Sequence, residues 1–264
     1  MLPTVHVIGI PIKTFGVFFA LNFIAWGALV ARRLREIGKP VDWAYEMVFA
    51  AIVGGLVGAR GYYLLQNHQK LSFGNVFSGS GLIWYGGLIG GVVAMLIWAW
   101  RRNWISLALL DVAGPGLALG YAIGRIGCQV SGDGDYGRDW SGPWAMGYPK
   151  GTVPTHPGET VHPTPIYETL VMGLVAWVLW RMRFRARPGV LFAGYLVLGG
   201  LERFLVEFLR RNQHVVIGLT AAQIESFVMF VVGLVWLAIV ARRDGGLLTP
   251  AGPVARRAPV PAAA

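Results

Sequence analysis

Charged side chains inside apolar stretches are the residues of this chain best suited to chemistry. Arg125 lies in Gly124-Arg125-Ile126-Gly127 at the end of one apolar stretch, and Arg203 and Glu207 lie four residues apart in another. A charge inside a membrane-spanning segment is energetically costly, so each is a functional candidate by default. An arginine guanidinium can bind a phosphate through two parallel N–H donors. Two arginines at the depth of lipid headgroups therefore predict a site for a phospholipid headgroup.

Structural explanations compete with this interpretation. Arg203 and Glu207 share one face of a helix and can pair internally. Arg60, which follows the glycine-rich stretch Gly54–Gly58 suited to helix contact, could belong to ion pairs that lock the helices together. Long arginine side chains near helix ends can also extend to the membrane interface. Asp111 is expected to pair with an arginine or to cap a helix.

The composition indicates an integral membrane protein. The chain has 264 residues, of which 55% are hydrophobic and 14% are charged, and its mean hydropathy is +0.55. Soluble domains carry about 25% charged residues, and disorder requires low hydrophobicity. The one cysteine, Cys128, excludes a disulfide framework and a multi-cysteine metal site. The net charge of +10 is scattered between apolar stretches, so no nucleic-acid partner is expected.

The expected fold class is an all-α integral membrane protein with about seven transmembrane helices. A spanning helix needs about 20 predominantly apolar residues. Seven stretches meet this requirement: Phe15–Val30, Ala44–Gln66, Leu82–Trp100, Ile105–Ile126, Thr164–Trp180, Val190–Phe208 and Gly218–Val240.

The distribution of basic residues predicts the orientation of these spans. Fourteen lysines and arginines follow the first, third, fifth and seventh spans, against six on the opposite side. The positive-inside rule then places the N-terminus outside and the C-terminus in the cytoplasm. Residues 1–246 are expected to form a single polytopic membrane domain, with an external loop at about 127–163. Residues 247–264 are expected to form a disordered cytoplasmic tail.

Four motifs in this order resemble the prolipoprotein diacylglyceryl transferase family over roughly Phe15 to Val240. They are Gly86-Gly87-Leu88-Ile89-Gly90, then Gly124-Arg125-Ile126-Gly127 continuing to Tyr136-Gly137-Arg138, then His162-Pro163-Thr164-Pro165-Ile166-Tyr167-Glu168, and lastly Arg203-Phe204-Leu205-Val206-Glu207-Phe208-Leu209-Arg210. Gly218-Leu219-Thr220 before Gln223 also matches the start of the family's last span.

The resemblance implies an activity and its partners. It implies transfer of a diacylglyceryl group from phosphatidylglycerol to the lipobox cysteine thiol in the signal peptide of a prolipoprotein, with release of glycerol phosphate. It implies no metal and no organic cofactor. The enzyme would be a multi-pass protein of the bacterial plasma (inner) membrane, and its lipid substrate would enter from the outer leaflet of the bilayer.

The resemblance also assigns candidate site residues. The catalytic candidates are Arg125, Arg203, Asp133 and Tyr85. The substrate-binding candidates are Gly86, Gly87, Gly127, Gly137, His162 and Glu207. In this assignment Arg125 and Arg203 stabilise the charge of the leaving phosphate, and Glu207 holds Arg203 in place.

The sequence departs from the family pattern at several positions. Tyr85 replaces a histidine and Phe15 a tyrosine, while Cys128 replaces an asparagine and Gly199 a tyrosine. The family's acidic residue in the second motif matches Asp133 only with one extra residue, and Asp135 is the competing match.

These departures leave the general base open. Tyrosine, with a reference pKa of about 10, is poorly suited to accept a proton near neutral pH. Asp133, Asp135, His162 or the lipid phosphate would then take the proton. The alternatives are a transferase for another acceptor, a lipid-binding relative without activity or, less favoured, a transporter. Cys128 is expected to be a packing residue, and His156 with His162 is a weak metal signal.

Overall fold

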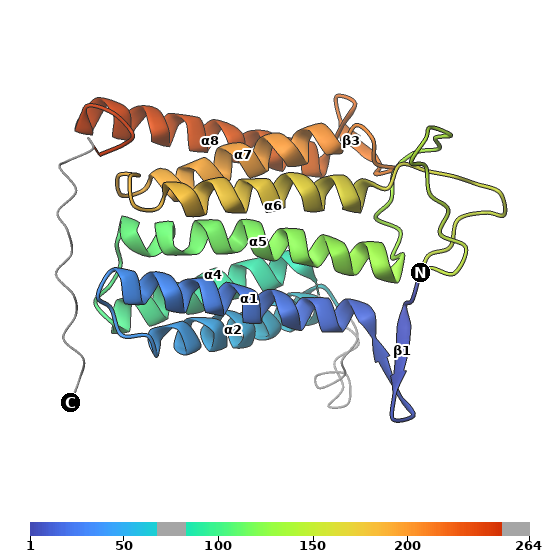
Figure 1. Cartoon of the computed structure of the whole chain (residues 1–264), viewed down its shortest axis with the longest axis horizontal. Helices are drawn as coiled ribbons and strands as arrows, with labels where there is room; N and C mark the ends of the chain where they lie inside the picture. The colour runs from blue at the N-terminus through green and yellow to red at the C-terminus, as the bar shows by residue number, and fades with distance from the viewer. Residues whose placement is uncertain (68–82, 250–264) are drawn as a thin grey trace.

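Seven long helices, running alternately in opposite directions, lie side by side in the computed structural model, which describes residues 1–67 and 83–249 (Figure 1). They are α1 (Thr14–Glu36), α2 (Trp43–Gln66), α4 (Trp84–Arg101), α5 (Leu107–Ser131), α6 (Thr164–Met182), α7 (Val190–Val206) and α8 (Ala221–Asp244). Each contains one of the seven predicted spans or most of it. The predicted start of the third span, Leu82, lies outside the described residues.

The two ends of the bundle differ in character. One end carries the N-terminal residues, the long loop 132–163 and the segment 207–220, and we call it the loop end. The opposite end carries the short connections 37–42, 102–106 and 183–189, and we call it the basic end because the predicted cytoplasmic arginines adjoin these connections. Loops that alternate between two ends are the arrangement expected of a polytopic membrane domain.

Four of the described helices are long and apolar enough to cross a membrane: α1, α2, α5 and α8. The segment Tyr85–Arg101 of α4 is a shorter apolar helix. Helix α6 contains the buried Glu168, and α7 contains the buried Glu202. Arg203 follows Glu202 directly in α7. The fold is therefore mostly helical, and the buried acidic residues of its described helices lie in α6 and α7.

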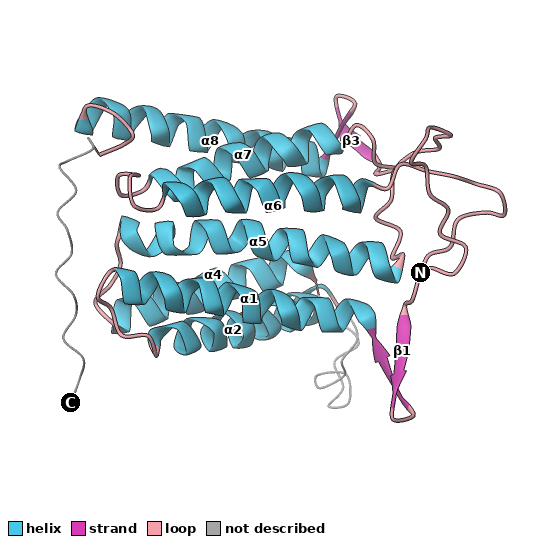
Figure 2. Ribbon diagram, viewed as in Figure 1, coloured by secondary structure: helices cyan, strands magenta, loops and turns pink. Residues whose placement is uncertain are grey.

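Two short antiparallel hairpins at the loop end correct the all-α expectation (Figure 2). The first pairs β1 (Thr4–Val7) with β2 (Ile10–Lys13), and the second pairs β3 (His214–Val216) with β4 (Leu219–Thr220). Each turns through an isoleucine and a glycine that both have positive φ, a geometry that matches the twist of a two-residue hairpin.

Several predicted boundaries also need correction. Helix α5 continues to Ser131 and ends at Gly132 (φ 59°), so the long loop begins five residues later than expected. Gly218 lies in a hairpin turn, and the last helix begins at Ala221, after a capping box formed by Thr220 and Gln223. Helix α7 ends at Val206 rather than Phe208.

The predicted disordered tail begins with ordered residues. The backbone N–H of Arg187 donates to Leu247, and that of Thr249 donates to Arg185 at 2.7 Å, so residues 247–249 pair with the connection between α6 and α7. The rest of the predicted tail, 250–264, lies outside the described residues.

Helix α5 is central to the bundle, since it packs against α1, α6 and α7, while α2 packs on α4 and α7 on α8. At the basic end Asp111 of α5 accepts hydrogen bonds from the backbone N–H groups of Gly189 (2.6 Å) and Phe192 (3.0 Å). Asp111 therefore caps the start of α7, one of the two roles predicted for it.

Glycines bring α2 and α4 into backbone contact, as the glycine-rich stretch predicted. A Cβ on Gly58 would lie 2.2 Å from the carbonyl oxygen of Gly86, and one on Gly54 would lie 2.5 Å from that of Gly90. Small residues at this spacing let two helices in a membrane approach closely.

We therefore expect Gly58→Ala to destabilise the protein by about 1–3 kcal/mol, the usual cost of overpacking. Gly61→Ala is the matched control in the same helix, because a Cβ there meets no atom within 4 Å. Thermal unfolding in detergent compares the two variants. Equal melting temperatures for Gly58→Ala and wild type would contradict the close α2–α4 contact.

Candidate active site

A cluster of alternating arginines and carboxylates lies at the loop end of the bundle. Arg125 comes from α5, Glu168 from α6 and Arg203 from α7, while Asp135 lies in the long loop. Glu207 and Arg210 follow directly after α7. We call these six residues the charge cluster. Its three formal positive and three formal negative charges balance, which limits the cost of burying them.

Glu168 is the centre of the charge cluster. Its side chain has no exposed surface, and its Oε2 forms an ion pair with Arg125 Nε at 2.7 Å. Its Oε1 accepts from Arg210 Nη1 at 3.1 Å, and the hydroxyl of Tyr121 on α5 also donates to Oε2. Sequence reasoning quoted Glu168 in a motif but gave it no role. Its position inside a predicted span was the signal that could have identified it.

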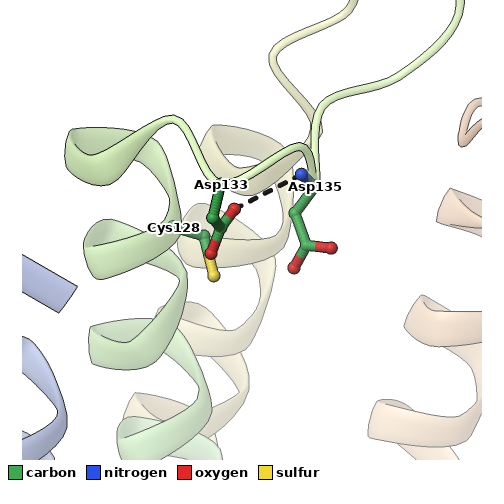
Figure 3. A group of neighbouring side chains, drawn as sticks. All are labelled: Cys128, Asp133 and Asp135. Carbon is green, nitrogen blue, oxygen red and sulfur yellow. Dashed lines mark hydrogen bonds between the residues drawn. The ribbon is translucent and has the colours of Figure 1, made fainter. Parts of the chain in front are cut away.

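Asp135, rather than Asp133, joins the charge cluster. Arg125 Nη1 donates to its Oδ2, and Arg210 Nη2 donates to its Oδ1. Burial alone would raise the pKa of Asp135, but these two guanidinium groups outweigh it and hold the pKa below its ordinary value. Asp133 instead accepts a hydrogen bond from the backbone N–H of Asp135 at 3.3 Å (Figure 3). The catalytic role of Asp133 stays a prediction.

The predicted pairing of Arg203 with Glu207 is confirmed. Arg203 Nη2 lies 3.0 Å from Glu207 Oε2, and the Glu207 side chain has no exposed surface. Glu207 Oε1 also accepts from Thr220 Oγ1 at 2.9 Å and from Asn212 Nδ2 at 2.6 Å. Glu207 therefore connects the end of α7 to the start of α8 and orients Arg203 at the same time.

The three arginines differ in the donors that they have left to use. Arg125 uses Nε for Glu168, Nη1 for Asp135 and Nη2 for Tyr121. Arg203 Nη1 donates no hydrogen bond within the described residues and lies 3.9 Å from Glu168. With 21% of its side chain exposed, Arg203 is also the most accessible of the three. Arg210 Nε likewise donates no hydrogen bond within the described residues, but only 6% of the Arg210 side chain is exposed, so Arg203 is the arginine that an anionic ligand reaches more readily.

Gly137 and the long loop place Arg210, which sequence reasoning missed. Gly137 forms an isolated bridge with Arg210, and a Cβ on Gly137 would lie 2.5 Å from the carbonyl oxygen of Leu209. Arg138 donates from its backbone N–H to Leu209 (2.7 Å) and from its Nε to the Arg210 carbonyl (3.2 Å). Only glycine fits this close approach between two segments. The sequence signal for Arg210 was its place in the last motif, but it was counted among the external basic residues.

The other predicted glycines lie at helix contacts. Gly86 and Gly87 face α2, and a Cβ on Gly127 would lie 2.9 Å from the Cβ of Phe18 on α1. These contacts explain why glycine is required at Gly86 and Gly127, and their predicted roles in substrate binding stay predictions.

Two further candidates lie outside the contacts of the charge cluster. The His162 ring stacks on Trp140 at 4.4 Å, and its Nδ1 lies 3.4 Å from the hydroxyl of Tyr167. The hydroxyl of Tyr85 donates to Glu225 of α8. The predicted site residues therefore fall into separate groups, of which the charge cluster contains Arg125, Arg203 and Glu207.

Cys128, Asp133 and Asp135 form a group whose ligand atoms lie within 4.8 Å of one another (Figure 3). Such a group resembles a metal site, but both oxygens of Asp135 already accept from arginines. Two guanidinium groups next to a divalent cation would repel it, so these side chains do not fit a metal ion. The buried Cys128 fits the predicted packing role.

The fold and the charge cluster describe a helical membrane protein with a buried polar site at one end of its bundle, and comparison with known proteins gives its family. The chain belongs to the prolipoprotein diacylglyceryl transferase family, whose model matches residues 3–239. This confirms the resemblance seen in the four motifs.

Individual relatives carry the name phosphatidylglycerol–prolipoprotein diacylglyceryl transferase. The one from Geobacter sulfurreducens is 32% identical over 249 residues, covering 89% of this chain and 93% of the relative. Those from Clostridium tetani and Paraburkholderia phymatum are each 29% identical, over 232 and 287 residues. They cover 86% and 91% of this chain, and 92% and 93% of the respective relatives.

We expect Glu168→Gln to lower the free energy of unfolding by about 3–5 kcal/mol, because it leaves buried guanidinium groups without their shared carboxylate. Glu46→Gln is the control, since Glu46 pairs with Arg102 at the basic end and both side chains are partly exposed. Such a pair contributes at most about 1 kcal/mol. Thermal unfolding of both variants in detergent measures the difference. An unchanged melting temperature for Glu168→Gln would show that the charge cluster does not stabilise the bundle.

Proposed function

We propose that this protein transfers the diacylglyceryl group of phosphatidylglycerol to the lipobox cysteine thiol of a prolipoprotein. Its family and the names of its relatives support this activity. The structural observation that carries the proposal is Arg203, which keeps a free Nη1 donor inside an otherwise charge-balanced cluster. An anionic phosphodiester is a ligand that this donor suits.

Arg203 binds the lipid phosphate in this proposal, and Glu207 orients it. The phosphate accepts from Arg203 Nη1, which lies 3.9 Å from Glu168. The 3.0 Å ion pair with Glu207 uses Nη2, so it persists when the phosphate binds. Arg125, whose three donor nitrogens are all in use, holds Asp135 and Glu168 in position. The two arginines, which sequence reasoning treated as equivalent, thus have different roles.

The transfer is a substitution at the glycerol carbon that carries the phosphate. The thiol loses its proton, the thiolate sulfur forms a bond to that carbon, and the carbon–oxygen bond to the phosphate breaks. The oxygen keeps the electron pair and leaves as glycerol phosphate. Negative charge grows on this phosphate in the transition state, and Arg203 stabilises it there more strongly than in the bound lipid.

The proposed membrane arrangement follows from the same residues. All seven helices cross the bilayer of the bacterial plasma (inner) membrane, with the loop end outside and the basic end in the cytoplasm. Within the described residues, the basic residues that follow the first, third, fifth and seventh predicted spans adjoin the basic end, which supports this orientation. The charge cluster then lies toward the outer leaflet, where phosphatidylglycerol and the signal peptide of a secreted prolipoprotein can both reach it.

Cysteine labelling in intact cells tests the orientation. We expect an impermeant thiol reagent to label Lys150→Cys, in the long loop, without permeabilisation. Arg101→Cys, at the basic end, should react only after permeabilisation. The native Cys128 is buried, so background labelling should be low. The reverse pattern would overturn the orientation and the outer-leaflet position of the site.

Transfer of radiolabelled phosphatidylglycerol to a lipobox peptide tests the function. We expect wild-type protein to label the peptide and Arg203→Ala to lose roughly 10²–10³-fold or more in kcat, the usual loss when one charge-stabilising donor is removed. Arg125→Ala should also abolish transfer, because it removes one of the arginines that hold Glu168 and Asp135 in position and leaves Arg210 as their shared close arginine. Arg243→Ala is the control at the basic end, where Arg243 pairs with the exposed neighbour Asp244.

Two results of this assay would contradict the proposal. Absence of label in the peptide with folded wild-type protein would exclude this transferase activity. Near-wild-type turnover by folded Arg203→Ala would exclude Arg203 as the phosphate ligand.

A further inference from the structure

Glu225 is a carboxylate near the loop end of α8 to which neither the charge cluster nor the family motifs give a role. It is the fifth residue of α8 and lies on an exposed face of that helix. The hydroxyl of Tyr85, the second residue of α4, donates to its Oε1. An ionisable residue within a membrane helix that faces away from the protein interior is costly, so a function is the expected reason for it.

Glu225 differs in its partners from the three carboxylates of the charge cluster. Asp135, Glu168 and Glu207 each pair with two or more arginines, which stabilise their charged forms. Within residues 1–67 and 83–249, no basic side chain pairs with Glu225, whose hydrogen-bond partner is a neutral phenol. Glu225 can therefore receive a proton without the loss of an ion pair.

Asp133, which accepts from the backbone N–H of Asp135 at 3.3 Å, stays a candidate base, whereas three other groups are less suitable. Both oxygens of Asp135 accept from arginines, and the His162 ring lies between Trp140 and Tyr167. Glu202 of α7 is 7% exposed and has an Oε2 without a hydrogen-bond partner in the described structure. It lies too deep to meet a thiol that arrives from the bilayer. Tyr85 is 45% exposed, so Glu225 and Tyr85 together form an accessible pair.

The position of the pair relates it to the charge cluster and to the bilayer. Glu225 follows Thr220 by five residues, a rise of about 7.5 Å along the chain, and Thr220 donates to Glu207, the partner of Arg203. The hydrogen bond from Tyr85 of α4 to Glu225 of α8 also connects two helix pairs, α2 with α4 and α7 with α8. A lipid-attached reaction centre and a thiol on a membrane-embedded peptide can reach this depth.

We propose that Glu225 accepts the proton of the substrate thiol and that Tyr85 positions its carboxylate. This inference rests on the proposed transferase function. The S–H proton moves to Glu225 as the sulfur attacks the glycerol carbon, and the carbon–oxygen bond to phosphate breaks. The protonated Glu225 then releases its proton to water. The Tyr85 hydroxyl donates to one carboxylate oxygen and leaves the other for the thiol.

Glu225→Gln removes the proton acceptor and keeps an oxygen that can accept from Tyr85. We expect kcat to fall roughly 10²–10⁴-fold, the usual contribution of a general base, with little change in KM for the peptide. Tyr85→Phe keeps the carboxylate and should lower kcat only about tenfold, the loss of one hydrogen bond. Asp244→Asn, at the basic end of the same helix, is the matched control.

Two further measurements separate a base from a structural residue. Added acetate should partly restore turnover to Glu225→Ala and not to Arg203→Ala. The wild-type kcat should also fall with acidification, whereas Glu225→Gln should lose that limb of the profile. On the α2–α4 side the titratable groups near Glu225 are Tyr85 and Tyr62, and in the described structure no charged group of α7 or α8 pairs with it.

The outcomes distinguish this inference from the function on which it rests. If wild-type protein transfers no lipid, the proposed function fails. If wild type is active and folded Glu225→Gln stays within threefold of it, the function stands and the role of Glu225 is wrong. A larger loss for Tyr85→Phe than for Glu225→Gln would assign the proton transfer to Tyr85 instead.

Discussion

The fully buried carboxylate of Glu168 is the constraint on which the loop end of this structure depends. It lies in an apolar helix, where an unpaired charge costs several kcal/mol, so the fold must place cations beside it. Arg125 and Arg210 bind it directly, and Arg203 lies 3.9 Å away. These partners come from α5, α7 and the segment after α7, so one charge requires these elements to meet. Asp135 and Glu207 then balance the excess positive charge and connect the long loop and α8 to the same cluster.

The sequence predicted the parts of this arrangement that depend on local spacing. The seven apolar stretches, the pairing of Arg203 with Glu207 four residues later and a helix contact through Gly54–Gly58 follow from helix periodicity, but the sequence did not identify α4 as the partner helix. The contacts of Glu168 and Asp135 with Arg210 join residues 42 and 75 positions apart, which no spacing rule relates. The choice between Asp133 and Asp135 depended on where Gly132 ends α5, and the role of Gly137 on how closely Leu209 approaches it.

The proposed mechanism separates binding of the phosphate from removal of the thiol proton. Arg203 has an unused donor in the charge cluster, whereas Glu225 and Tyr85 form their own pair between α8 and α4. Among the departures from the family pattern, Tyr85 donates a hydrogen bond to a carboxylate, that of Glu225. The change of a histidine to a tyrosine is therefore compatible with activity if the acceptor is the neighbouring carboxylate. Phe15 lies beside Gly127, at the contact of α1 with α5. Cys128 lies beside Arg125, next to the charge cluster.

Complementation of a bacterium depleted of its own diacylglyceryl transferase tests the central claim most directly. If the chain is an active transferase, its expression should restore growth and lipid modification of prolipoproteins, whereas Arg203→Ala expressed at the same level in the membrane should restore neither. Failure of the inserted wild-type protein to restore lipid modification would contradict the claim, and so would equal rescue by wild type and Arg203→Ala.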